Sequence, residues 1–482
     1  MHLPDLIADA LGNGLRSYLL TVSGFLLAVL VLARLQGERR APANTLAWLL
    51  IVVLLPYVGV PLFLLVGGRK LRRLVARKAP VCPAPPVDAP RAAACADSPV
   101  AQAIVSAGAP PPVAGNAVRL LTTGEETYAV LEEHIRAARH SVDIMTFILG
   151  RDDTGRRLIR LLAARAREGV KVRLLLDSVG CMFLSRDFLR RLTRAGGEVA
   201  WFMPVLHFAP RGAANLRNHR KIAVFDRRTA MVGGHNLARL YLGPQPWRKR
   251  WPDFGAIITG PAAAQLHEVF IADWCFTTGQ TPATVRGNGF ASNDDGLASG
   301  PAELQVVASG PDVPGDPLYE GILAMIQEAK ESVVLITPYF IPDEVLMRSL
   351  TVKARAGRAV TLLVPTKPDH LITELARRHA LRALHAAGVE VRLVGPGMMH
   401  SKALIVDDRL ALFGSANFDP RSLFVNFEIG VFVHSQPEVL AMKAWADSLR
   451  VRSHAYRPEP PRGFAPLREL AEEVSRLLAP ML

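Results

Sequence analysis

The sequence predicts an α/β protein built of two similar halves, with two membrane-spanning helices in front of them. Three observations lead to this fold class. Helical and strand patterns alternate over most of the chain, the same order of elements occurs twice, and two long uncharged runs lie near the N-terminus. Apolar strands that alternate with amphipathic helices are typical of a sheet covered by helices on both faces.

The composition is that of a folded, basic protein. Of the 482 residues, 50% are hydrophobic and 21% are charged, which excludes a disordered chain. The 57 lysines and arginines exceed the 43 acidic residues by 14, which favours anionic partners such as phospholipid, nucleic acid or phosphorylated substrates. The four cysteines form no CxxC pair, so we expect neither a disulfide framework nor a structural zinc site.

Residues 1–78 are predicted to form an N-terminal membrane anchor. Uncharged runs extend from Ser17 to Ala33 and from Thr45 to Gly68, and about 20 such residues cross a hydrocarbon core as a helix. We therefore expect transmembrane helices at about 15–34 and 45–68.

A basic cluster follows the second run, and it predicts the orientation of the anchor. Its members are Arg69, Lys70, Arg72, Arg73, Arg77 and Lys78. The positive-inside rule places the N-terminus and the large C-terminal part in the cytoplasm. The cluster acts as a topology determinant, as a contact with anionic lipid, or as both.

The remainder of the chain is predicted to contain a duplicated unit. Residues 79–116, rich in Pro and Ala, are predicted to be a linker. We expect the first half at 117–285, a second linker at 286–300, the second half at 301–450, and a tail with an amphipathic helix at 451–482. The matching elements are a helix, strand, helix, strand and later strand, at 127–139, 141–149, 154–169, 170–177 and 194–202, and again at 319–330, 332–341, 343–357, 359–365 and 386–394.

Each half contains the same polar motif, H-x-K-x4-D followed by Asn. The first copy reads NHRKIAVFDRRTAMVGGHN and the second MHSKALIVDDRLALFGSAN. In both copies Asn stands 17 residues after His, and two such matches in a duplicated chain leave little room for accident. The candidate residues are His219, Lys221, Asp226 and Asn236 in the first copy, and His400, Lys402, Asp407, Ser415 and Asn417 in the second.

The spacing predicts where the side chains of the motif point. His and Lys are two residues apart and share one face of a strand, whereas Asp, seven residues after His, falls on the other face or in a turn. Asp226 and Asp407 are therefore expected to support the site from behind. Two-residue turns would bring further residues level across each hairpin. The expected pairs are His219 with Asn236, Lys221 with Gly234, His400 with Asn417, and Lys402 with Ser415.

Brought together, the two motifs would form an anion site with two imidazoles. Lysine and Asn side chains supply hydrogen-bond donors, and small Gly and Ser residues allow a backbone to approach an oxyanion closely. One histidine can attack phosphorus while the other protonates the leaving oxygen. Since the lysines and amides stabilise the charge on the equatorial oxygens, we expect no metal and no other cofactor.

The chain resembles the phospholipase D superfamily, whose mark is two HKD motifs, and within it the bacterial cardiolipin synthases. The shared stretches are TLAWLL, LLPYVG, NHRK, GGxN, TPYFIPDE, HSKALIVDD and GSANFDPRS. The resemblance implies an α/β/α fold for each half and transfer of a phosphatidyl group between two phosphatidylglycerol molecules through a phosphohistidine. Cardiolipin and glycerol would be the products. The implied location is the bacterial inner membrane, with the catalytic body on the cytoplasmic side.

The resemblance also implies a carboxylate downstream of each histidine that orients its ring. Asp253 in WPDFG and Glu428 in NFEIG stand at such positions. Pro252 departs from the family pattern, which often has Arg there, and His235 fills the variable position of GGxN. By the same analogy, His219 would be the nucleophile.

Three other functions stay open from the sequence. A hydrolase of the same superfamily would release phosphatidic acid, a phosphodiesterase would use the positive charge to bind nucleic acid, and a membrane scaffold would need no chemistry. The predicted spans argue against nucleic acid as a partner, and two complete motifs argue against a scaffold. No pattern in the sequence decides whether phosphatidylethanolamine can replace one phosphatidylglycerol, or what the oligomeric state is.

Overall fold

The computed structural model describes residues 22–26, 29, 50–60, 78, 93–204, 216–286, 300–313, 315–458, 472 and 475. They fall into two compact units, Met1–Leu71 with Val205–Leu216, and Arg72–Pro204 with Arg217–Leu482. In the first unit, the helical stretches 22–26 and 50–60 contact each other, since Ser23 Oγ lies 2.6 Å from Tyr57 Oη. Among the described residues, no helix combines the length and the apolar character that a membrane crossing requires. The spans predicted at 15–34 and 45–68 lie largely outside the described residues.

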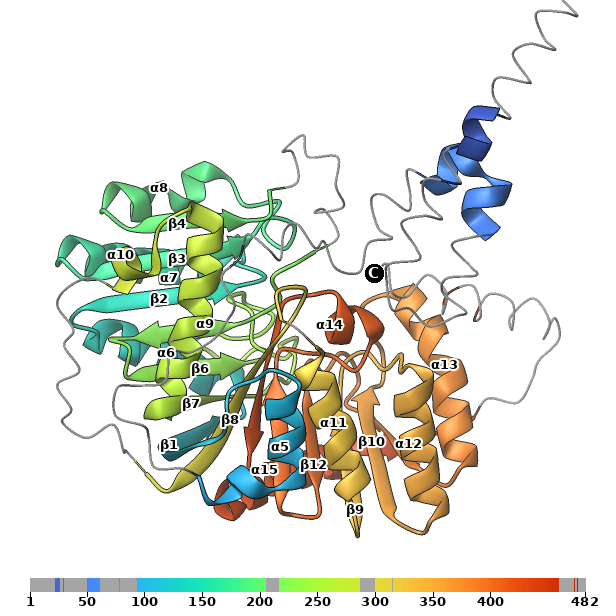
Figure 1. The fold of residues 1–482 in the computed structure, drawn as a ribbon. Helices are drawn as coiled ribbons and strands as arrows, with labels where there is room; N and C mark the ends of the chain where they lie inside the picture. Colours follow the sequence, from blue (N-terminus) through green and yellow to red (C-terminus); the bar gives the residue numbers. More distant parts are fainter. Residues whose placement is uncertain are drawn as a thin grey trace, which may run out of the picture. The chain divides into compact units, whose positions relative to one another are not determined.

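The second unit contains both predicted halves apart from Val205–Leu216, and the order of elements repeats (Figure 1). The first half consists of β1 (Val113–Leu121), α6 (Gly124–Ala137), β2 (Ser141–Thr146), α7 (Asp153–Arg167), β3 (Lys171–Asp177), α8 (Arg186–Arg194), β4 (Glu198–Phe202), β5 (Ile222–Phe225), β6 (Thr229–Gly233), β7 (Gly255–Thr259), α9 (Pro261–Thr278) and α10 (Pro282–Arg286). The second half consists of β8 (Ala302–Ser309), α11 (Pro317–Glu328), β9 (Ser332–Ile336), α12 (Glu344–Arg355), β10 (Ala359–Pro365), α13 (Leu371–Ala386), β11 (Glu390–Val394), β12 (Ala403–Val406), β13 (Leu410–Gly414), α14 (Pro420–Phe424), β14 (Glu428–Val433), α15 (Gln436–Val451) and β15 (Ser453–Ala455).

The strands of the two halves form one continuous 15-stranded sheet in the order β15-β11-β10-β9-β12-β13-β14-β8-β1-β7-β6-β5-β2-β3-β4. Antiparallel pairing of β1 with β8 joins the halves, with a register irregularity between Val113 and Asn116. Outward from this central pair, β7-β6-β5-β2-β3-β4 in one direction matches β14-β13-β12-β9-β10-β11 in the other. The predicted duplication is confirmed, and it places the hairpins β5–β6 and β12–β13 at equivalent positions.

Helices cover both faces of the sheet, as predicted. In the first half, α6, α7 and α8 pack on alternate strand residues such as Val142 and Ile144. Helix α9 covers the opposite face, where His267 Nε2 lies 3.1 Å from Asp143 Oδ2. The second half repeats this layering, with α11, α12 and α13 over one core and α15 on the strands β12 and β13.

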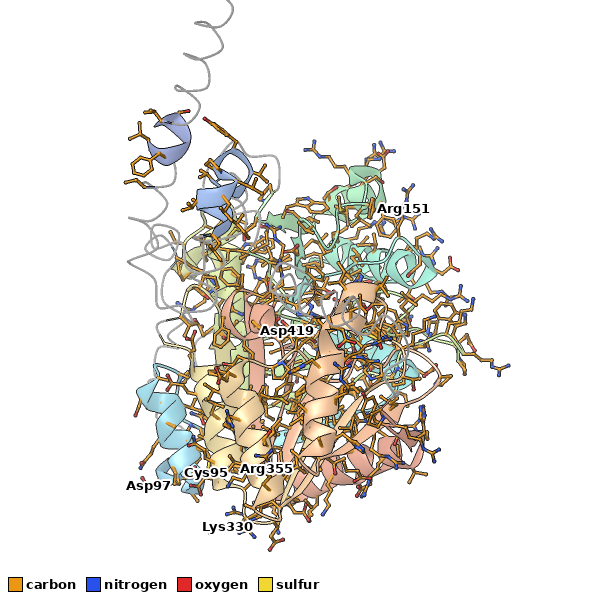
Figure 2. All side chains as sticks on the ribbon, turned by 90° about the vertical axis from the view of Figure 1, so that its right-hand side faces the viewer. Cys95, Asp97, Arg151, Lys330, Arg355 and Asp419 are labelled. Carbon is orange, nitrogen blue, oxygen red and sulfur yellow. The ribbon has the colours of Figure 1, made fainter. Side chains whose placement is uncertain are left out.

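The linker predicted at 79–116 is wrong for its second part. The 3₁₀ helix η1 (Ala94–Asp97), the helix α5 (Pro99–Ser106) and the start of β1 lie within it; Figure 2 labels Cys95 and Asp97 of η1. Helix α5 packs on α11 and buries Val100 and Ile104 in the core of the second half. The abundance of Pro and Ala hid a short amphipathic helix that begins with Ser98 as its N-cap and Pro99 at its first position.

The predicted boundaries of the second linker and of the tail are only partly described. Residues 287–299 of the linker at 286–300 lie outside the described residues. The tail predicted from residue 451 begins with β15, which pairs antiparallel with β11 and so extends the sheet of the second half. In the predicted tail helix, Glu472 and Ser475 are described as helical and buried, and Glu472 accepts a hydrogen bond from Arg382 at 3.2 Å.

Candidate active site

The two motif hairpins have three-residue turns, so the predicted register is wrong by one residue. Phe225 is level with Thr229 across β5 and β6, and Val406 is level with Leu410 across β12 and β13. Continued past the strand ends, this register brings Lys221 level with Gly233 and not with Gly234. The same shift applies to the other predicted pairs, which were His219 with Asn236, His400 with Asn417, and Lys402 with Ser415.

Asp226 explains the longer turn in the first half. Its carboxylate accepts three backbone N–H groups, at 2.8 Å from Arg139, 2.7 Å from His140 and 2.8 Å from Ser141. To reach them Asp226 adopts a left-handed backbone with φ of 48°, a conformation that Asp tolerates better than most residues. The carboxylate therefore anchors the hairpin to the start of β2, which confirms that it supports the site from behind.

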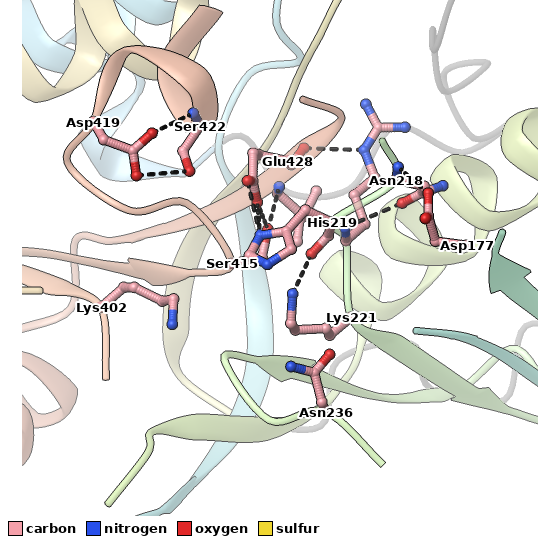
Figure 3. A network of polar contacts seen from close by, with 12 residues as sticks. Asp177, Asn218, His219, Lys221, Asn236, Lys402, Ser415, Asp419, Ser422 and Glu428 are labelled. Carbon is pink, nitrogen blue, oxygen red and sulfur yellow. Dashed lines mark hydrogen bonds and ion pairs between the residues drawn. The ribbon is translucent and has the colours of Figure 1, made fainter. Parts of the chain in front are cut away.

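Asp407 plays the same part in the second half. It accepts backbone N–H groups from Lys330, Glu331 and Ser332 at 2.7, 2.8 and 2.7 Å, and its φ is 51°. Figure 2 shows Lys330 at one end of the second half, away from Asp419, whose side chain lies beside the candidate site in Figure 3. The equivalence of the two aspartates follows from the duplication.

His219 is held by the second half of the chain. Its backbone N–H donates to Phe427 O at 2.9 Å, and its Nδ1 lies 2.9 and 3.1 Å from the two carboxylate oxygens of Glu428. The Glu428 side chain is fully buried, whereas 12% of the His219 side chain is exposed, next to the edge of Phe147. Figure 3 shows this pairing between neighbouring backbone segments of the two halves.

His400 is held by the first half in the same manner. Its backbone N–H donates to Pro252 O at 2.7 Å, and its Nδ1 lies 2.7 Å from Asp253 Oδ2. The His400 side chain is 5% exposed, and the rings of Tyr241 and Trp251 lie 4.9 and 6.1 Å from it.

Each histidine is therefore paired with a carboxylate from the other half. A carboxylate downstream of each histidine in its own half would pair Asp253 with His219 and Glu428 with His400, but the structure exchanges these partners. The two carboxylates identified from the resemblance are in contact with the imidazoles. The exchange means that neither histidine is oriented unless the two halves pack together.

Both motif lysines are buried beside the histidines. Lys221 Nζ donates to His219 O at 2.6 Å, and Lys402 Nζ donates to His400 O. Burial lowers the pKa of Lys221 to about 7 and that of Lys402 to about 8, although nearby carboxylates act in the opposite direction. Lys402 also lowers the pKa of Lys221. Two cations that repel each other in one buried region, visible in Figure 3, form a site that an anion would stabilise.

The two carboxylates beside the imidazoles have pKa values shifted in opposite directions. Burial lowers the pKa of His219, while His219, Lys221 and Ser415 hold the pKa of Glu428 below its ordinary value against the effect of burial. An ionised Glu428 at this distance would accept the Nδ1 proton of a neutral His219 and leave Nε2 with its lone pair. Burial instead raises the pKa of Asp253 and lowers that of His400.

Ser415 and Gly234 occupy equivalent positions but contribute differently. The Ser415 hydroxyl donates to Glu428 Oε2 and accepts the N–H of Ile429 at 3.0 Å. The hydroxyl of Ser415 thus contacts the carboxylate that lies against His219, and phosphate binding by Ser415 stays a prediction. A Cβ atom at Gly234 would lie 2.1 Å from Asp253 Oδ1, so the first half requires glycine where the second half has serine.

The two motif asparagines are engaged with protein groups. Asn236 Oδ1 accepts the backbone N–H of Ile148 at 3.1 Å, and the side chain also hydrogen-bonds Tyr241. Asn417 hydrogen-bonds the carboxylate of Asp419. Phosphate binding by Asn236 and Asn417 stays a prediction.

Sequence reasoning missed a buried layer of charge beneath His219. Arg220 donates from Nη1 to both carboxylate oxygens of Asp273, at 2.8 and 2.9 Å, and from Nε to Glu428 O at 3.0 Å. Asn218 Nδ2 donates to Asp273 Oδ2 at 2.9 Å. The polar residues Asn218 and Arg220 on both sides of His219 in NHRK were the sequence signal for this layer. Only the fold shows that Asp273 of α9 accepts their hydrogen bonds.

Within the described ranges, no three His, Cys, Asp or Glu side chains gather as ligands for a metal ion. Independence from metals stays a prediction, and a chelator tests it.

Comparison with known proteins identifies the family. The family model described as cardiolipin synthase, PLD-like domain, matches residues 131–274 and 322–450, and a model of the phospholipase D-nuclease N-terminal region matches residues 25–68. Cardiolipin synthase of Geobacillus kaustophilus is 34% identical over 484 residues, which cover 97% of this chain and 94% of the relative. The chain belongs to the cardiolipin synthase family.

Further comparisons support this family and its fold. Cardiolipin synthase A of Pseudomonas aeruginosa is 35% identical over 382 residues, 79% of this chain and 76% of the relative. The crystal structure of phosphatidylserine synthase from Haemophilus influenzae superposes with a TM-score of 0.59 at 16% identity, and covers 80% of this chain and all of that one. At that identity the likeness concerns the fold alone, which is the two-half phospholipase D-like architecture.

Proposed function

We propose that this family member transfers a phosphatidyl group from one phosphatidylglycerol to another and forms cardiolipin and glycerol. The observation that carries the proposal is the exchanged pairing of His219 with Glu428 and of His400 with Asp253. It supplies two oriented imidazoles beside two buried lysines, which is what a two-step phosphoryl exchange needs.

In the first step, Nε2 of His219 attacks the phosphorus of the donor lipid. A P–N bond forms as the bond from phosphorus to the glycerol headgroup oxygen breaks, and His400 gives its proton to that oxygen. Lys221 and Lys402 stabilise the charge on the remaining phosphate oxygens. The bound phosphodiester also raises the low pKa of His400, because a nearby negative charge favours the protonated imidazole.

In the second step, a headgroup hydroxyl of the second phosphatidylglycerol attacks the same phosphorus. The neutral His400 accepts the hydroxyl proton, the P–N bond breaks, and His219 regains its lone pair. The sum is two phosphatidylglycerol molecules converted to cardiolipin and glycerol, with both histidines returned to their starting states. Water is the competing acceptor, so net transfer depends on excluding it or on placing the lipid hydroxyl first.

The membrane setting is part of the proposal. We propose that residues 1–78 anchor the chain in the bacterial inner membrane by two spans, with the catalytic body at 117–450 on the cytoplasmic side. The match of residues 25–68 to an N-terminal family model and the uncharged runs support this anchor. Phosphatidylglycerol and anionic lipid, rather than nucleic acid, are the proposed partners.

Product analysis tests the function. Purified protein in phosphatidylglycerol vesicles, with label in the headgroup glycerol and in one acyl chain, is expected to release free glycerol and accumulate labelled cardiolipin. Phosphatidic acid without cardiolipin would replace the transferase with a hydrolase. EDTA should leave the rate unchanged, and a requirement for added metal would contradict the mechanism above.

A further inference from the structure

The layer beneath His219 contains a side chain from outside both halves. Lys78, the last residue of the predicted basic cluster, forms ion pairs with Asp273 and Asp312. The side chains of the three residues are 1%, 0% and 2% exposed. A lysine that serves only membrane topology or lipid contact would have no reason to be buried between two carboxylates.

The charges of this layer balance when Lys78 is counted. Asp273 and Asp312 are faced by Arg220, whose Nη2 lies 3.5 Å from Asp312 Oδ1, and by Lys78. Burial acts to raise the pKa of Asp273, but Arg220 and Lys78 hold it below its ordinary value. Without Lys78, two buried carboxylates would share one guanidinium.

The same layer supports the backbone that carries the imidazole. Arg220, the residue after His219, donates from Nη2 to Ser309 O at 3.0 Å and from Nε to Glu428 O at 3.0 Å. Phe427, whose carbonyl accepts the N–H of His219, has Lys78 Nζ 4.7 Å from its ring centroid. Lys78 thus contacts groups on both sides of the His219–Glu428 pair.

We propose that Lys78 is a positioning residue of the active site, which completes the buried cluster of Asp273, Asp312 and Arg220 and thereby fixes the His219–Glu428 pair. Lys78 stands ten residues after Gly68, the end of the second predicted span. The predicted basic cluster thus supplies a positioning residue. This inference rests on the proposed function for its activity readout, but the cluster can be tested without it.

The test compares Lys78→Met with Lys78→Arg, with Asp312→Asn, and with the double variant Lys78→Met/Asp312→Asn. In full-length protein in phosphatidylglycerol vesicles, Lys78→Met is expected to lower kcat roughly tenfold or more, since an uncompensated buried charge displaces the groups around it. Lys78→Arg and the double variant should recover most of the rate, because both restore the charge balance. The unfolding temperatures of the variants, measured without substrate, should rank them in the same order as their kcat values. This measurement tests the cluster even if the protein forms no cardiolipin.

The pH dependence of kcat/KM distinguishes a role of Lys78 in positioning His219 from a general loss of folded protein. His219 is faced by Glu428 and Lys402 from the second half and by Lys221 from its own segment, just before β5. An added unpaired negative charge nearby favours its protonated form, so in Lys78→Met the acid limb of kcat/KM should move up by about half a pH unit. The double variant should return the limb to its original position.

Lys70→Met is the matched control, because it removes the same charge from the same basic cluster. It should shift neither the acid limb nor the unfolding temperature. Equal effects of Lys70→Met and Lys78→Met, or a double variant no better than Lys78→Met alone, would overturn the proposal.

Discussion

The two halves carry the same motif on equivalent hairpins, yet they hold their histidines in different surroundings. His219 pairs with Glu428, which Ser415 also hydrogen-bonds, and 12% of its side chain is exposed. His400 is 5% exposed between aromatic rings and pairs with Asp253, beside a glycine in place of the serine. The two halves share the backbone arrangement of the motif hairpins. The side chains that surround His219 and His400 differ between the halves.

We propose that this difference divides the chemistry between the two imidazoles. In the proposed mechanism, an ionised Glu428 accepts the Nδ1 proton of His219 and leaves Nε2 to attack, and a bound anion favours the protonated form of His400, whose pKa burial lowers. A nucleophile needs a free ring nitrogen, as His219 would have beside Glu428. A general acid that acts only on bound substrate suits the surroundings of His400.

The largest effects are expected from the histidines themselves. His219→Ala and His400→Ala should each lower cardiolipin formation by about 10⁴-fold, since each role is required in every cycle. They should differ on a phosphatidyl ester with a nitrophenol leaving group, which needs no protonation. There His400→Ala should still release nitrophenol and accumulate phosphohistidine, detected by acid quench and peptide mapping. Phosphohistidine in His219→Ala but not in His400→Ala would reverse the assignment.

The orienting carboxylates come next. Glu428→Gln and Asp253→Asn should each lower kcat by roughly 10²- to 10⁴-fold, because an amide no longer fixes the tautomer of its histidine. Glu428→Gln should prevent phosphohistidine formation with the nitrophenol ester, whereas Asp253→Asn should not. Equal behaviour of the two variants on that substrate would mean that the exchanged pairing carries no division of roles.

A pair of small-residue changes sharpens the comparison further. Ser415→Ala removes a hydrogen bond to an ionised carboxylate, and we expect a fall in kcat of roughly 10- to 100-fold. Gly234→Ala places a Cβ atom on Asp253 Oδ1 and should affect the His400 step instead. Single-turnover measurements separate the two, since only Ser415→Ala should slow attack on the nitrophenol ester.

The smallest effect concerns stability. Backbone hydrogen bonds hold the pKa of Asp407 below its ordinary 3.8, against the effect of burial. Because the folded-state pKa is the lower one, the stabilisation is present above the ordinary value and is lost as pH falls through the folded value. Asp407→Asn should therefore flatten the fall in denaturation midpoint between pH 5 and pH 3. Asp408→Asn, which alters a half-buried pair with Lys443, is the control and should change the midpoint less.

Sequence patterns predicted much of this molecule because the relevant signals are local. Alternating apolar periodicity located the elements of each half, and the repeated motif located His219, Lys221, His400 and Lys402. Sequence patterns gave a wrong prediction where composition obscured the local signal or where no local signal existed. The Pro- and Ala-rich segment hid α5, and a turn held open by the carboxylate of Asp226 shifted the hairpin register by one residue.

The sequence by itself determined the duplicated α/β architecture and the two motifs, and its resemblance to the family pointed to Asp253 and Glu428 as orienting carboxylates. Only the tertiary structure decided that Glu428 contacts His219, that Asp253 contacts His400, and that Lys78 is buried with Asp273 beside the His219 segment. The physical reason is that periodicity and spacing act within a few residues of chain, whereas these contacts join segments that are far apart in the sequence, such as Asn218 with Phe427 and Pro252 with His400.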